Sequence, residues 1–123
     1  MTDTPTTLVV KLTAGAEALE RANQALTVTA TALASGFDVS LWLSGEATWF
    51  AVPDRLETHA LPHAVPLAEL LEPLLEAGAV TVCSQCAARR DLGVDDLRPG
   101  VVIRGSAAFV EEVMAPGTRT LVY

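Results

Sequence analysis

Five short apolar runs, separated by segments with helical spacing, restrict the fold of this chain more than any other feature. The runs cover residues 7–12, 38–43, 79–82, 101–104 and 118–123, and Val, Leu and Thr are frequent in them. Runs of this length and composition predict strands, and the first is apolar enough to be buried on both faces. Strands that alternate with helices predict an α/β fold, a three-layer α/β/α sandwich around a mostly parallel five-stranded sheet.

Apolar residues at intervals of three and four predict helices between these runs. The clearest helices cover residues 17–34 and 67–77. Pro73 lies inside the second and predicts a kink or two abutting short helices. A short helix or turn is expected over residues 47–52, followed by a long loop over residues 53–66 that could cover a site. Ser106 is the expected N-cap of a last helix that ends at Met114.

The composition predicts a folded protein that binds neither nucleic acid nor membranes. Half of the 123 residues are hydrophobic and 19% are charged, so we expect one domain over residues 1–123, with residues 1–6 disordered. The net charge is −7, whereas nucleic acids and anionic membranes require a basic patch. No apolar run approaches the roughly 18–20 residues that cross a membrane. The N-terminal residues lack the features of a signal peptide, so we expect a cytoplasmic location.

Both cysteines lie in one stretch, residues 80–91, which reads Val-Thr-Val-Cys-Ser-Gln-Cys-Ala-Ala-Arg-Arg-Asp and contains a Cys-x-x-Cys pair. Strand residues precede Cys83, and helix formers follow Cys86 toward Gly93, which is expected to stop the helix. Cys83 is therefore expected at the carboxyl end of a strand, the edge where ligands bind in open α/β sheets. Cytoplasmic thiols are normally reduced, so the pair indicates redox, sulfur or metal chemistry.

This position predicts a reactive thiol at Cys83. Helix N–H groups, a second cysteine and nearby cations all lower a cysteine pKa from its free value of about 8.5. We expect Cys83 to be the catalytic nucleophile, and Cys86 either to resolve a persulfide or disulfide on it or to pack in the first helical turn. Arg89 and Arg90 could bind an anionic sulfur substrate, and either is also typical of a solvated helix face.

The two histidines do not predict a metal site. His59 and His63 are four residues apart, a spacing that places two ligands on one face of a helix. Pro62 lies between them and argues against a regular helix, and their distance from Cys83 does not match common zinc modules. We therefore expect no metal. The phosphate-binding patterns GxGxxG and GxxxxGKS/T do not occur, and no cofactor is expected.

Three stretches of the chain resemble the DsrE/DsrF-like family of small sulfur-handling proteins. They are residues 22–45, residues 70–92 and residues 100–123, so that the resemblance extends over residues 8–123. The first and last carry mainly signals of the fold. The middle stretch carries the chemistry, because Leu-Leu-Glu-Ala-Gly-Ala-Val-Thr-Val-Cys-Ser-Gln-Cys-Ala-Ala-Arg-Arg ends a helix, forms a strand and reaches both cysteines.

The resemblance implies a role for each part of the middle stretch. In the family, a cysteine at the end of the third strand accepts sulfur, and a short helix with an arginine-glycine turn follows it. Cys83 matches this cysteine, and Arg89 and Arg90 match the arginines. Asp91 stands where glycine is usual, so the helix exit departs from the family pattern. The resemblance also implies a homo-oligomer, a trimer or hexamer, with sulfur donor and acceptor proteins as partners.

Three functions remain open at this point. The first is a cytoplasmic sulfur carrier or sulfurtransferase-like protein that holds sulfane sulfur as a persulfide on Cys83. The second is a thiol–disulfide oxidoreductase that cycles the Cys83–Cys86 pair. The third is a structural or regulatory subunit whose oligomeric surface, rather than its thiols, is the function.

Overall fold

The computed structural model describes residues 4–123, and in this range five parallel strands form a single sheet. The strand order is β4-β3-β2-β1-β5, and every neighbouring pair is parallel. The expected α/β fold is therefore confirmed, with an all-parallel sheet instead of a mostly parallel one. The strands are β1 (Thr7–Leu12), β2 (Asp38–Leu43), β3 (Val80–Cys83), β4 (Val102–Arg104) and β5 (Thr118–Val122).

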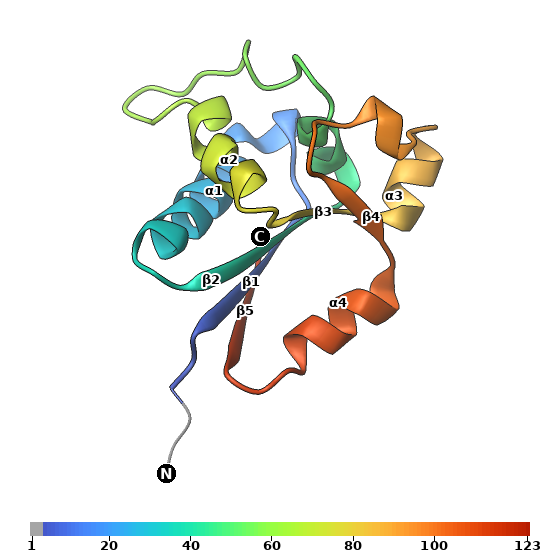
Figure 1. Cartoon of the computed structure of the whole chain (residues 1–123). Coiled ribbons are helices and arrows are strands. Elements are labelled where there is room, and N and C mark those ends of the chain that lie inside the picture. Colours follow the sequence, from blue (N-terminus) through green and yellow to red (C-terminus); the bar gives the residue numbers. More distant parts are fainter. Residues whose placement is uncertain (1–3) are drawn as a thin grey trace.

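Helices cover both faces of this sheet (Figure 1). Helices α1 (Leu19–Ala34) and α2 (Leu67–Glu76) pack on one face, and α4 (Ser106–Val113) crosses the other. Helix α3 (Ser84–Arg89) directly follows β3. Three short 3₁₀ helices complete the described part of the chain: η1 (Ala16–Ala18), η2 (Gly45–Ala51) and η3 (Val94–Asp96). Right-handed crossovers explain why α4 lies on the face opposite α1 and α2. The β1-to-β2 and β2-to-β3 connections run toward the β4 edge of the sheet, whereas the β4-to-β5 connection runs back to the other edge.

Alternation along the strands divides the sheet into an apolar face and a more polar one. The apolar face packs against α1 and α2 and forms the main core. The other face is covered by α4, where the Phe109 ring packs edge-on against Trp42 with centroids 5.2 Å apart. The side chains toward α1 and α2 include Val10, Leu12, Leu41, Leu43, Val80 and Val82.

The end of α3 corrects one prediction. The helix ends at Arg89, four residues before Gly93, because Asp91 adopts a left-handed conformation with φ +56°. The Leu92 N–H then donates to the carbonyl of Ala87 over 2.9 Å, which closes the helix in a Schellman-type turn. Asp is one of the few non-glycine residues that adopt this conformation readily, so it fills the position where the family usually has glycine.

Other element boundaries also differ from the prediction. The N-cap of α4 is Gly105 instead of Ser106. Ser106 is the first residue of the helix, and no side-chain hydrogen bond caps this end. A single helix, α2, runs through Pro73 instead of two short helices. The first helix begins as the 3₁₀ turn η1 and becomes α-helical only at Leu19, because Ala18 is not helical at φ −146°.

The N-terminal prediction of disorder over residues 1–6 falls partly on residues 1–3, which lie outside the described residues. Thr6 is held by the sheet: its N–H donates to the Gly117 carbonyl over 2.9 Å, and its carbonyl accepts from Asp38 N–H over 2.9 Å. Among the helices of residues 4–123, none has the length and apolar character needed to cross a membrane.

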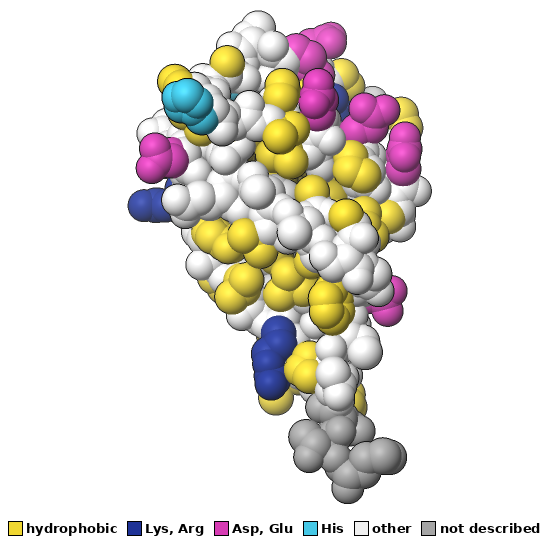
Figure 2. Space-filling view, turned by 90° about the vertical axis from the view of Figure 1, so that its left-hand side faces the viewer, with side chains coloured by type: hydrophobic (Ala, Val, Ile, Leu, Met, Phe, Trp, Pro, Cys, Tyr) yellow, Lys and Arg dark blue, Asp and Glu magenta, His cyan; other side chains and the backbone are white. Residues whose placement is uncertain are grey.

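A groove of about 560 Å³ opens beside α1, at the amino ends of β1 and β5. Leu8, Val28, Phe37 and Arg119 are among the residues that line it. Figure 2 shows the side of the molecule on which α1 lies, where hydrophobic side chains gather over the middle of the surface. The groove lies at the amino ends of the strands, whereas Cys83 lies at the carboxyl end of β3. The groove is therefore not the site predicted around the cysteines.

Candidate functional site

Cys83 lies where the sequence predicts it, at the carboxyl end of a strand and the start of a helix. It is the last residue of β3 and the N-cap residue of α3, with extended backbone angles of φ −62° and ψ 127°. Val80 and Val82 point into the main core, so the alternation of β3 turns Cys83 toward the face that α4 covers. Cys83 is a free cysteine, and the residue is partly exposed.

The surroundings of Cys83 favour its ionised form. Burial raises the pKa of the thiol, but the N–H groups of Cys86 and Gln85, the Cys86 thiol and the Lys11 ammonium lower it, and together they bring the pKa below its ordinary value. The side chain makes no capping hydrogen bond to α3, so we interpret these N–H groups as nearby dipoles. A thiolate is the nucleophilic form of cysteine, so the lowered pKa increases the nucleophilic fraction of Cys83.

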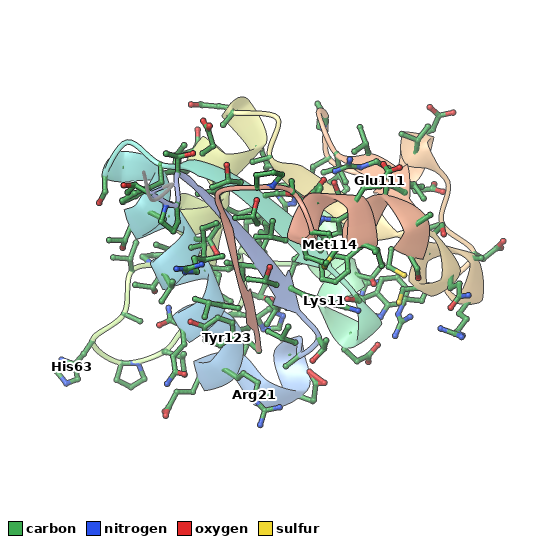
Figure 3. The ribbon with its side chains drawn as sticks, turned by 90° about the horizontal axis from the view of Figure 1, so that it is seen from below. Lys11, Arg21, His63, Glu111, Met114 and Tyr123 are labelled. Atoms are coloured by element: carbon green, nitrogen blue, oxygen red, sulfur yellow. The ribbon has the colours of Figure 1, made fainter. Side chains whose placement is uncertain are left out.

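Lys11 is a member of this site that the sequence analysis missed. Its neighbours on β1, Val10 and Leu12, point into the main core, and Lys11 points to the opposite face. There its Nζ lies 5.0 Å from the centre of the Phe109 ring of α4 (Figure 3). A single lysine inside the apolar run of residues 7–12 was the available signal, because a charged residue in such a strand requires a specific environment.

Cys86 lies behind Cys83, in the first turn of α3. Its side chain is only 7% exposed. The backbone N–H of Gly45, at the start of η2, donates to Cys86 Sγ over 3.2 Å. The structure thus brings both predicted cysteines into one turn, in which Cys83 is partly exposed and Cys86 is buried.

The two predicted arginines occupy different environments. Arg89 is exposed on α3. Arg90 forms an ion pair with Glu46 of η2 at 2.8 Å and donates to the carbonyl of Cys86 over 3.1 Å. In this arrangement Arg90 ties α3 to η2 and thereby holds the turn that carries the cysteines. The ion pair also lowers the pKa of Glu46.

A polar cluster occupies the α4 face of the sheet next to Cys83. Arg104 pairs with Cys83 in the register of β3 and β4. Its guanidinium donates to Glu112 of α4 over 2.6 Å and to the Thr81 hydroxyl over 2.7 Å. Burial raises the pKa of Glu112, but hydrogen bonds from Ser40, Trp42 and Arg104 lower it, and the net pKa is below the ordinary value. The cluster fixes α4 against the sheet beside the thiol.

The histidines lie apart from the cysteines. His59 packs edge-on against Phe50 with ring centroids 6.3 Å apart, and His63 is exposed in the loop over residues 53–66. This loop runs from the end of η2 to the start of α2 (Figure 1), and His63 lies on the side of the molecule away from α3 (Figure 3). Within the part of the chain that the structure describes, no three His, Cys, Asp or Glu side chains are grouped as metal ligands.

Comparison with known proteins agrees with this fold. The model of the DsrE/DsrF-like family matches residues 8–122. The YchN protein of E. coli is a similar solved structure, with 20% identity, a TM-score of 0.66, and coverage of 97% of this chain and 99% of that chain. MTH1491 of Methanobacterium thermoautotrophicum, a protein of unknown function, is 13% identical with a TM-score of 0.66, over 95% of this chain and 98% of that chain. At these identities the two structures support the fold alone, and no curated protein matches the chain.

Proposed function

The chain belongs to the DsrE/DsrF-like family, and on that premise we propose that it is a sulfur carrier with sulfurtransferase-like chemistry. Cys83 accepts sulfane sulfur as a persulfide and passes it to an acceptor thiol. The observation that carries the proposal is the partly exposed Cys83 thiol, whose pKa is lowered although burial opposes ionisation. Family membership suggests a role in sulfur relay, and the site supplies a nucleophile suited to it.

The proposed reaction consists of two exchange steps. The Cys83 thiolate attacks the outer sulfur of a donor persulfide R–S–SH, the donor S–S bond breaks, and R–S⁻ leaves while Cys83 becomes Cys83–S–SH. An acceptor thiolate then attacks the outer sulfur of Cys83–S–SH, takes it as a new persulfide and releases the Cys83 thiolate. Each step forms one S–S bond and breaks one, and no external oxidant is required.

The proposal also includes a substrate-binding residue, partner proteins and an oligomeric state. Arg89 is the more available of the two arginines for an anionic sulfur substrate, since Arg90 is paired with Glu46. The protein acts in the cytoplasm as a single domain, receives sulfur from a donor protein and delivers it to an acceptor protein. It works without a cofactor and as a trimer or hexamer, a state consistent with the general tendency of the family to oligomerise.

One observation favours a second candidate function. Cys83 and Cys86 lie in the same helical turn, so a thiol–disulfide oxidoreductase could cycle them between two thiols and a disulfide. The 7% exposure of Cys86 favours the carrier, because only Cys83 is open to a partner. A purely structural subunit is the third candidate, favoured by the exposed apolar side chains of Val110 on α4 and of Met114, the residue that caps its end.

Intact-mass spectrometry after incubation with a persulfide donor separates these functions. The carrier predicts the gain of one sulfur atom, located on Cys83, and the same gain in the Cys86→Ser variant. The oxidoreductase predicts the loss of two hydrogen atoms and no gain of sulfur. The structural subunit predicts that Cys83→Ser leaves the cellular role intact, whereas the carrier requires that this variant neither gains sulfur nor functions.

A further inference from the structure

We propose that Cys86 is a positioning residue for Cys83: its thiol, held by the backbone N–H of Gly45, donates a hydrogen bond to the Cys83 thiolate. This inference deepens the proposed function and rests on it. In this role Cys86 does not attack a persulfide and remains a thiol throughout transfer.

Helix α3 places the two cysteines at positions that face each other. Cys83 is the N-cap residue, and Cys86 is the third helical residue after it. Residues three apart at the start of a helix lie on the same side of its first turn. The local fold therefore places the two cysteines on one side of this turn, where the Cys86 thiol is the nearest side-chain donor that α3 offers to Cys83.

The contact with Gly45 sets the direction of the hydrogen bond. Because the Gly45 N–H donates to Cys86 Sγ over 3.2 Å, it engages the sulfur as an acceptor and leaves the S–H proton free to donate. At 7% exposure, the Cys86 side chain has little contact with water that could compete for this proton. Burial raises the pKa of Cys83, and the Cys86 thiol is among the groups that lower it. A hydrogen bond donated to a thiolate has this effect, because it stabilises the charged form.

The backbone around Gly45 is fixed in the position that this contact requires. Gly45 has φ +54°, and a Cβ atom there would lie 2.7 Å from the carbonyl oxygen of Thr13. The residue follows β2, the neighbour of β3, so the ends of these adjacent strands bring η2 to the first turn of α3. The ion pair of Arg90 with Glu46 joins the same two segments. Two independent contacts therefore hold Cys86 in place.

Alkylation of Cys83 by iodoacetamide as a function of pH, followed by peptide mass spectrometry, tests this role. Cys86→Ala removes the donor, so the rate at pH 7 should fall about three- to tenfold, the effect of losing one hydrogen bond. The rates of this variant and the wild type should converge at high pH, where Cys83 is ionised in both proteins. Cys86→Ser retains a donor and should stay within about twofold of wild type. Ser84→Ala, in the same turn, is the matched control and should not change the profile.

Three results would overturn the inference, and the first two are a Cys86→Ala profile equal to that of the wild type and a Cys86→Ser profile shifted as far as that of Cys86→Ala. Rates that fail to converge at high pH would also do so, because they indicate structural damage instead of a lost donor. The persulfide-loading experiment remains separate. If the wild type gains no sulfur while the alkylation profiles shift as expected, the proposed function fails and the positioning role of Cys86 stands.

Discussion

At the scale of single residues, the charge of Lys11 acts on Cys83 across strand β2. β1 and β3 both flank β2, and Lys11 and Cys83 point to the same face of the sheet. Burial raises the pKa of the Cys83 thiol, and the Lys11 ammonium is one of the groups that lower it. The interaction crosses a partly solvated face, so it is weaker than a direct ion pair.

We expect Lys11→Met to raise the pKa of Cys83. A higher pKa means less thiolate at neutral pH, so alkylation at pH 7 should slow by about two- to fourfold, the effect of one charge at this range. Lys11→Arg keeps the charge and serves as the control. The difference between the two variants should shrink at high salt. Equal alkylation rates for Lys11→Met and the wild type would exclude this role of Lys11.

The sequence predicted the position of Cys83 better than the surroundings of this residue. Cys83 was found because its signal is local: an apolar strand, two cysteines and a helix in twelve residues. Lys11, Arg104 and Glu112 lie far from it in the chain, and only the strand order places them on one face. The partner of Arg90 was likewise unpredictable, because Glu46 belongs to a 3₁₀ helix after another strand.

At the scale of elements, α4 depends on a few specific contacts. None of its side chains is fully buried, so its attachment to the sheet relies on Phe109 against Trp42 and on Glu112. Glu112 accepts hydrogen bonds from Ser40 over 2.6 Å and from Trp42 over 3.0 Å, besides its ion pair with Arg104.

We expect Glu112→Gln to lower the free energy of unfolding by about 1–2 kcal/mol, because the polar groups beneath α4 lose a charged acceptor. Burial raises the pKa of Glu112, but its hydrogen bonds and Arg104 lower it, so the folded pKa lies below the unfolded value of 4.5. Its contribution is therefore present above pH 4.5 and is lost as the pH falls through the folded pKa.

Urea unfolding at a series of pH values measures this contribution. The stability difference between the wild type and Glu112→Gln should be constant near neutral pH and should shrink in acid. Glu111→Gln changes an exposed neighbour on the same helix and should remain within about 0.5 kcal/mol of wild type. A difference that stays constant down to the lowest pH would show that the carboxylate charge of Glu112 is not what holds α4.

Element boundaries were predictable where the sequence signal was strong. β1 (Thr7–Leu12) and β2 (Asp38–Leu43) begin and end as expected, because each largely apolar run starts with a polar residue and is followed by one, Thr13 or Ser44. The end of α3 was not, since Asp91 takes a left-handed conformation that a sequence pattern assigns first to glycine. Pro73 was expected to kink α2 or to divide it into two short helices, and one helix is found, in which the Leu70, Leu71 and Leu74 side chains are buried.

At the scale of the whole molecule, apolar side chains remain exposed on the α4 side of the sheet. Val110 on α4 is 53% exposed, Met114 at the C-cap of this helix is 76% exposed, and Val122 on β5 is 64% exposed. β5 is an edge strand, which adds unpaired backbone groups to this surface. An apolar surface of this kind is typical of a protein–protein interface.

The resemblance to the DsrE/DsrF-like family implies a trimer or hexamer, so sedimentation equilibrium should give an assembly mass that is three or six times 12.9 kDa. Met114→Glu places a charge on this surface and should shift the protein toward smaller species. Val65→Glu introduces the same charge at a 51% exposed residue of the loop over residues 53–66 and should leave the assembly unchanged. A wild-type protein that sediments as a monomer at all concentrations would contradict the proposed assembly.

The central claim is that Cys83 alone receives sulfur and gives it up again. A load-and-chase experiment tests it most directly: the wild-type protein is exposed to a persulfide donor, purified, and then treated with an excess of an acceptor thiol, with peptide mass spectrometry after each step. We predict one added sulfur atom on Cys83 after loading, its transfer to the acceptor after the chase, and an unmodified Cys86 throughout. Sulfur found on Cys86, or a Cys83 that remains unmodified by the donor, would contradict the account.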